Sequence, residues 1–134
     1  MKQRIISVSS VNPEKVFVLG GINGLSDANI QSCLNTYAEL LDDLKADMPN
    51  TVFYIQSVLP VSKSKELSVC HNTTIQQFNQ GIKTLAEERN MIYIDLYSLY
   101  EVNGEMNPDL TRDGVHIWPE AYELWANAIK QYIE

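Results

Sequence analysis

Short apolar runs that alternate with helical patterns constrain the fold of this chain more than any other feature. The first run, residues 15–19, is closed by Gly20-Gly21 and is typical of a strand buried on both faces. Residues 51–58 form a second β-rich run and residues 91–94 a third. A helical pattern separates each run from the next. This alternation predicts right-handed crossovers and a mostly parallel sheet with helices on both faces, which is a three-layer α/β/α fold.

Three helical patterns place apolar side chains on one face. The first runs to Pro49, with Asp27 as its predicted N-terminal cap, and the second opens with Thr74 and Gln77 at capping-box spacing. Residues 1–11 fit either a short helix or a frayed strand. The core-facing side of the C-terminal helix is predicted from its periodicity to contain Ala121, Tyr122, Trp125, Ala128, Ile129, Tyr132 and Ile133.

Composition excludes several classes of function. The 134 residues carry a formal net charge of −7 and their basic residues are scattered, so nucleic-acid binding is not expected. No apolar run approaches the ~20 residues of a membrane span, and the N-terminus does not resemble a signal peptide. Cys33 and Cys70 show no metal-binding spacing. The chain is therefore predicted to be one domain, residues 1–134, without a metal site.

A candidate site follows from Asp113 and His116, which share a glycine-containing turn ahead of the last helix. Alone, this pair is more often a turn with a hydrogen-bonded histidine than a catalytic pair. However, Gly21 and Asn23 follow the first strand and are expected at the same edge of the sheet, where ligands bind in parallel α/β folds. An imidazole oriented by a carboxylate is half of a nucleophilic hydrolase site. Trp118, next to the histidine, fits either a substrate pocket or a surface position.

These residues carry a resemblance to a known family. Gly21-Ile22-Asn23, the segment Ile-Gln-Ser-Val-Leu-Pro at 55–60, Tyr-Ile-Asp-Leu-Tyr at 93–97 and the Asp-x-x-His block at 113–116 resemble the SGNH (GDSL-type) esterases and acylhydrolases. The resemblance implies a flavodoxin-like fold, no cofactor and a small-molecule ester as substrate. It implies that His116 is the general base, that Asp113 orients the imidazole, and that Asn23 and Gly21 form the oxyanion hole.

The chain also departs from the family pattern. It contains no Gly-Asp-Ser, the block that holds the nucleophile in the family, and Gly24 stands where the family usually has aspartate. By comparison with the family pattern, the first one or two βα units are also missing, which predicts a sheet truncated to about three strands. Ser57 and the serines at 7, 9 and 10 do not sit on the glycine-flanked turn that exposes an activated hydroxyl. The chain alone is therefore expected to be inactive.

Three interpretations follow. The chain is a fragment or mis-started product of an esterase with its nucleophile upstream of Met1, a non-catalytic domain that binds a ligand, or an oligomerising remnant of the fold. A sheet that lacks strands exposes an edge near Val16 to Leu19, which predicts a homo-oligomer joined there. The localisation is left unknown: the sequence as printed reads as that of a cytoplasmic protein, but a missing N-terminus would have removed any signal peptide with it.

Overall fold

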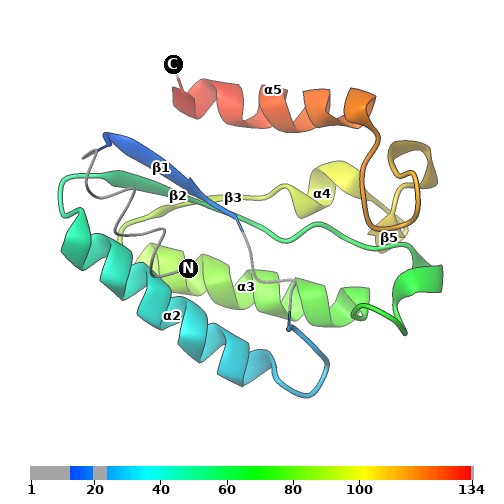
Figure 1. The fold of residues 1–134 in the computed structure, drawn as a ribbon, viewed down its shortest axis with the longest axis horizontal. Helices are drawn as coiled ribbons and strands as arrows, with labels where there is room; N and C mark the ends of the chain where they lie inside the picture. Colours follow the sequence, from blue (N-terminus) through cyan, green and yellow to red (C-terminus); the bar gives the residue numbers. More distant parts are fainter. Residues whose placement is uncertain (1–12, 20–23, 134) are drawn as a thin grey trace.

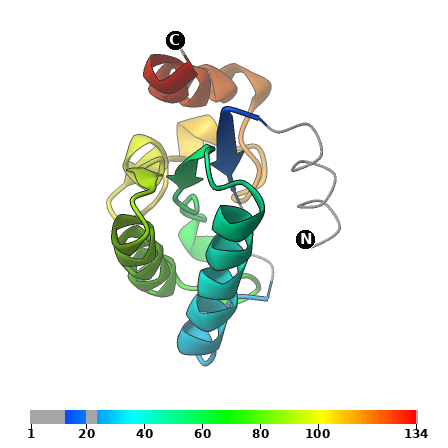
Figure 2. The ribbon, with the colours of Figure 1, turned by 90° about the vertical axis from the view of Figure 1, so that its left-hand side faces the viewer.

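A parallel sheet lies between one helix on one face and two helices on the other in the computed structural model (Figures 1 and 2). The structure describes residues 13–19 and 24–133. Within these residues the main sheet has the order β1 (Lys15–Val18), β2 (Val52–Gln56) and β3 (Ile92–Ile94), all parallel. The predicted α/β/α architecture with about three strands is thus confirmed. The predicted element at residues 1–11 lies outside the described residues.

The strands alternate their side chains between two apolar layers, as the period of two in a β-strand requires. In the central strand β2, Phe53 and Ile55 face the layer of the paired helices, whereas Tyr54 faces the opposite layer. All three are buried, which explains why this run is continuously apolar. On β1, Phe17 stacks on Tyr54 with 4.6 Å between ring centroids. Each layer therefore draws its core from alternate positions of the same strands.

Two helices, α2 (Ile30–Asp47) and α3 (Asn72–Glu88), cover one face of the sheet and lie side by side (Figure 2). Their close approach depends on Gly81 of α3, because a Cβ there would lie 2.6 Å from both methyl carbons of Leu34. Their buried positions largely follow the predicted helical periodicity, and the core side chains are Tyr37, Leu41, Leu44, Ile75, Phe78, Ile82 and Ala86.

The opposite face is covered by α5 (Tyr122–Ile133) alone (Figure 1). The helix packs on the sheet through its partly buried Trp125, Ala128, Ile129 and Tyr132, but it has no fully buried residue. The prediction that Tyr122 and Ile133 face the core is wrong, since they are 52% and 58% exposed. A single helix contacts the sheet along a narrow stripe, so the edges of its apolar face stay in solvent.

The chain between β3 and α5 forms smaller elements. These are α4 (Tyr97–Tyr100), the antiparallel pair β4 (Glu101–Val102) and β5 (Glu105–Met106), and the short 3₁₀ helices η2 (Pro108–Leu110) and η3 (Pro119–Ala121). Another 3₁₀ helix, η1 (Lys63–Lys65), lies in the segment after β2 that carried no predicted element. No helix of the described part is long and apolar enough to cross a membrane. Three parts of the chain carry the candidate site. They are the segments that follow β1 and β2 and the turn that precedes α5.

Candidate functional site

The Asp113 carboxylate shapes the turn that presents His116. One oxygen, Oδ1, accepts hydrogen bonds from the backbone N–H groups of Val115 (3.0 Å) and His116 (2.7 Å). The other, Oδ2, lies 2.8 Å from Nδ1 of the His116 imidazole. A neutral imidazole that donates its Nδ1–H to this carboxylate leaves Nε2 as an acceptor. Because the His116 side chain is 70% exposed, Nε2 is accessible from solvent.

The pKa of Asp113 is lowered well below its usual value of 3.8. The largest cause is the hydrogen bond from the backbone N–H of His116, followed by the contact with the His116 side chain and the N–H of Val115. The carboxylate is therefore ionised whenever an imidazole can act as a base. A lowered folded-state pKa stabilises the folded turn above the unfolded value, and this contribution is lost as the pH falls through the folded pKa.

The turn is attached to the loop after β2 through Gly114. The backbone N–H of Ser62 donates to the Gly114 carbonyl at 2.8 Å. Gly114 has a φ of +94°, and a Cβ at this position would lie 2.9 Å from Cγ of Lys65 and 3.0 Å from Cβ of Ser62. Both the backbone conformation and the close approach require glycine. The position of His116 therefore depends on contact between two loops.

We expect Gly114→Ala to lower the free energy of unfolding by more than the about 1–2 kcal/mol of a left-handed alanine, because the new methyl group also meets Ser62 and Lys65. The matched control is Gly104→Ala, where φ is +84° and nothing lies within 4 Å of the new Cβ. Urea unfolding of both variants measures the difference. Equal losses would show that the close approach at Gly114 contributes nothing.

An apolar cavity of about 190 Å³ opens beside this turn. It lies at the carboxyl ends of β1 and β2, and it is lined by Leu19, Val58, Leu59, Pro60, Val61, Val115 and Trp125. For scale, an apolar cavity of about 150 Å³ in another protein binds benzene. A small apolar group therefore fits next to the Asp113–His116 turn.

Two buried asparagines of α3 hold the backbone that forms one wall of this cavity. The side-chain amide of Asn79 accepts from the N–H of Val58 (2.8 Å) and donates to its carbonyl (3.0 Å). Asn72, two helical turns earlier, makes the same pair of bonds to Val61 at 2.9 Å and 2.8 Å. Neither residue was predicted from the sequence. Asn72 and Asn79 are seven residues apart, which places them on the apolar side of α3, and this spacing of two polar residues is a signal that could have identified them.

Ser57 is not available as a nucleophile. Its side chain is fully buried, and its Oγ accepts hydrogen bonds from the backbone N–H groups of Leu96 and Tyr97, both at 2.8 Å. These bonds give the hydroxyl a structural role at the point where β3 enters α4. The serines at 7, 9 and 10 lie outside the described residues.

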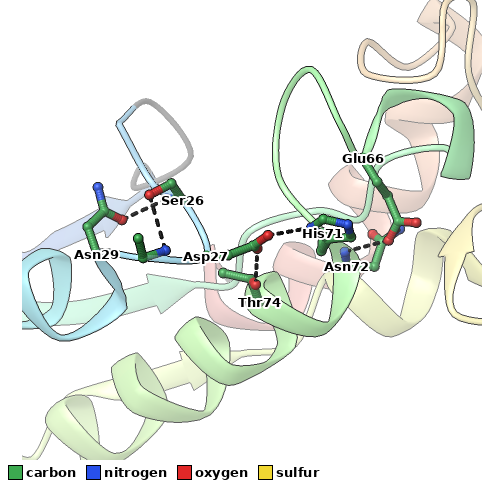
Figure 3. A network of polar contacts seen from close by, with 8 residues as sticks. Ser26, Asp27, Asn29, Glu66, His71, Asn72 and Thr74 are labelled. Atoms are coloured by element: carbon green, nitrogen blue, oxygen red, sulfur yellow. Dashed lines mark hydrogen bonds and ion pairs between the residues drawn. The ribbon is translucent and has the colours of Figure 1, made fainter.

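A second Asp–His pair joins the β1–α2 loop to the start of α3 (Figure 3). Asp27 Oδ2 lies 2.5 Å from Nδ1 of His71, and Asp27 Oδ1 accepts from the Thr74 hydroxyl. The bond from Thr74 is the largest cause of the lowered pKa of Asp27. The prediction that Asp27 caps the first helix is wrong, since α2 begins at Ile30 after Asn29. Tertiary contacts with α3 occupy both carboxylate oxygens instead.

The remaining predicted residues are placed only in part. Gly21 and Asn23, the predicted oxyanion-hole residues, lie outside the described residues. Trp118 is 41% exposed and lines a different cavity from the apolar one beside Val115. Among residues 13–19 and 24–133, no three His, Cys, Asp or Glu side chains come together in a way that would hold a metal ion. The described part of the site is therefore the Asp113–His116 pair with an adjacent apolar cavity.

Comparisons with known proteins agree on one family. A family model described as GDSL-like lipase/acylhydrolase matches residues 1–124. A multidomain esterase of Ruminococcus flavefaciens is 23% identical, and the match covers 95% of this chain but 17% of that protein. A GDSL-like lipase from Bacteroides thetaiotaomicron has a similar structure, with a TM-score of 0.80 and 24% identity over 98% of this chain and 67% of that chain. An acetyl xylan esterase has a TM-score of 0.78 and 19% identity over 99% of this chain and 74% of that chain.

Proposed function

The chain belongs to the GDSL-like lipase/acylhydrolase family, and we propose that it carries the base-and-carboxylate half of an ester hydrolase site. The observation that supports this most directly is the 2.8 Å contact between Asp113 Oδ2 and His116 Nδ1, with the imidazole exposed to solvent. In this role His116 Nε2 removes the proton from an attacking hydroxyl and returns it to the leaving alcohol. Asp113 holds the imidazole in the required tautomer and stabilises the imidazolium.

The proposal extends to the oxyanion hole and the acyl group. Gly21 and Asn23 follow β1 in the chain and are proposed to donate hydrogen bonds to the oxyanion of the tetrahedral intermediate. The apolar cavity that includes Leu19 and Val115 is proposed to hold a short acyl chain, since its lining is almost entirely hydrocarbon. The substrate class is therefore a small ester with a short apolar acyl group.

The nucleophile limits the expected rate. The printed sequence has no Gly-Asp-Ser, and Ser57 is buried and hydrogen-bonded. Loss of the nucleophile costs about 10⁶ in the protease where it was dissected, although about 10³–10⁴ over water remains. The proposal therefore predicts slow hydrolysis of p-nitrophenyl acetate that depends on His116. Equal rates for the wild type and His116→Ala would overturn it.

The alternative is a domain that binds an ester without turning it over. The missing Gly-Asp-Ser and the glycine at position 24 favour this alternative, and the apolar cavity would then serve binding alone. Saturable binding of a non-hydrolysable short-chain ester analogue, together with an absence of hydrolysis, would select it over the catalytic proposal.

We further propose that the chain forms a homo-oligomer through β1. In the described part of the chain, β1 pairs only with β2, so its other edge has no strand partner there. We expect light scattering to detect a dimer or larger species, and Leu19→Glu to weaken it, because Leu19 is exposed at the end of this strand. Leu67→Glu, at an exposed position in the loop after β2, is the control. A monodisperse wild-type monomer would contradict the proposal.

A further inference from the structure

The indole of Trp125, on α5, forms one wall of the apolar cavity beside Val115. The other lining residues are aliphatic and come from the segments after β1 and β2 and from the turn that carries His116. Among the described residues that line the cavity, Nε1 of Trp125 is the one polar side-chain atom. The orientation of this indole therefore decides both the shape of the cavity and whether a polar group inside it meets a donor.

The indole is held by Gln56, the last residue of β2. Nε1–H of Trp125 donates to Gln56 Oε1 at 2.7 Å, and Gln56 Nε2 lies 3.5 Å from the carbonyl oxygen of Val18 at the end of β1. Gln56 is 4% exposed, and an unpaired amide at such a buried position is costly. The indole N–H is therefore kept on Gln56, and the cavity presents only hydrocarbon to a ligand.

Trp125 also closes the cavity toward the layer beneath α5. The same side chain packs against the apolar cluster of Tyr54, Ile94 and Leu96, which lies between the sheet and the helix (Figure 1). The ring of Tyr122 stacks on it, with 6.0 Å between ring centroids. Because contacts with the sheet, with Gln56 and with Tyr122 all act on one indole, a shorter side chain at this position would extend the cavity beneath α5.

The size of the cavity sets a limit on what it can hold. An apolar cavity of about 150 Å³ in another protein holds the six carbons of benzene, so about 190 Å³ has room for roughly six carbons. Val115, on the opposite side of the lining from α5 in the chain, directly precedes His116. A chain that enters beside the turn therefore grows toward Trp125 and stops there.

We propose that Trp125 sets the upper limit on the length of the acyl chain at about six carbons, and that Gln56 positions its indole for this. The use of the cavity for an acyl group rests on the proposed function, whereas the length limit is a property of binding and needs no turnover. Trp125 is thus a specificity-determining residue, and Gln56 is a positioning residue that acts through it.

The test is binding of N-methyl amides with acetyl, butanoyl, hexanoyl and decanoyl chains, which are neutral mimics of an ester. Titrations of the full chain are followed by NMR through the backbone N–H signal of Val115. In the wild type we expect affinity to rise by about fourfold for each added methylene as far as hexanoyl, and no further to decanoyl. In Trp125→Ala the decanoyl amide should bind about tenfold tighter than in the wild type, or more.

The matched control is Leu124→Ala, which truncates an exposed neighbour on the same helix that does not line the cavity, and which should keep the wild-type limit. Gln56→Met preserves side-chain length but removes the acceptor. We expect it to shift the indole Nε1–H signal of Trp125 and to admit the decanoyl amide. If circular dichroism shows Trp125→Ala to be unfolded, the double variant Gln56→Met/Trp125→Phe carries the test, since it leaves no unpaired buried amide.

The outcomes separate this inference from the proposed function. A limit that stays at hexanoyl when Trp125 is shortened, or wild-type affinity that keeps rising to decanoyl, overturns it even where hydrolysis depends on His116. Absence of saturable binding of any of the amides overturns it too. A shifted indole signal in Gln56→Met with an unchanged limit removes the positioning role of Gln56. A limit that depends on Trp125, without any hydrolysis, upholds the inference and contradicts only the catalytic proposal.

Discussion

His116→Ala is expected to lower the rate of p-nitrophenyl acetate hydrolysis by about 10²-fold or more, since a positioned general base typically contributes about 10²–10⁴-fold. The wild-type rate itself should be far below that of an intact serine hydrolase, because the printed sequence lacks Gly-Asp-Ser. Initial rates at matched protein concentration, corrected for spontaneous hydrolysis, measure the effect. The exposed imidazole and its contact with Asp113 are the physical reason for the expectation.

His71→Ala provides a matched control for this experiment. His71 is the only other histidine in the chain, and its Nδ1 also contacts an aspartate, Asp27. It is partly exposed, so it would contribute to any unspecific hydrolysis by surface imidazoles. We expect the rate to fall in His116→Ala and to persist in His71→Ala. A similar fall in both variants would attribute the hydrolysis to imidazole chemistry in general and not to a site.

Asn79→Ala is expected to lower the free energy of unfolding by about 2–4 kcal/mol, because it leaves the buried N–H and C=O of Val58 without partners. Urea unfolding followed by circular dichroism measures the loss. The same change should open the wall of the apolar cavity, since Val58 lines it. A short-chain ester analogue is therefore expected to bind more weakly.

Gln77→Ala is the control, because Gln77 is an exposed position of the same helix, α3. Asn72→Ala should resemble Asn79→Ala, as its amide makes the equivalent pair of bonds to Val61. The two losses need not add, because both amides hold one loop. A loss below about 1 kcal/mol in Asn79→Ala would mean that water replaces the amide and that the loop does not depend on it.

Local patterns accounted for the layers of the fold and for the contact between Asp113 and His116 in the candidate site. Continuous apolar runs predicted β1, β2 and β3, because a strand covered on both faces needs apolar residues at every position. Asp113 and His116 are three residues apart in one turn, so their contact depends mainly on local backbone geometry. Such short-range features need no knowledge of the rest of the chain.

The structure follows one other local signal, and tertiary packing overrides two more. Asn103 and Gly104 have φ values of 55° and 84° and form the two-residue turn between β4 and β5, as is typical of an Asn-Gly pair between two strands. Asp27 is of a residue type that often caps helices, but its carboxylate contacts His71 and Thr74 of another segment instead. Tyr122 has core periodicity, yet one helix alone cannot bury the whole of its apolar face.

The amino-acid sequence by itself determined the alternation of strands and helices and the Asp113–His116 pair, because both depend on side chains close together in the chain. Only the tertiary structure decided which residues surround that pair. The apolar cavity unites Leu19, the segment after β2, Val115 and Trp125, and Asn72 and Asn79 support it from α3. The contact of Ser62 with Gly114 likewise joins two loops far apart in sequence. Such long-range contacts follow from how the layers pack, and no local pattern encodes them.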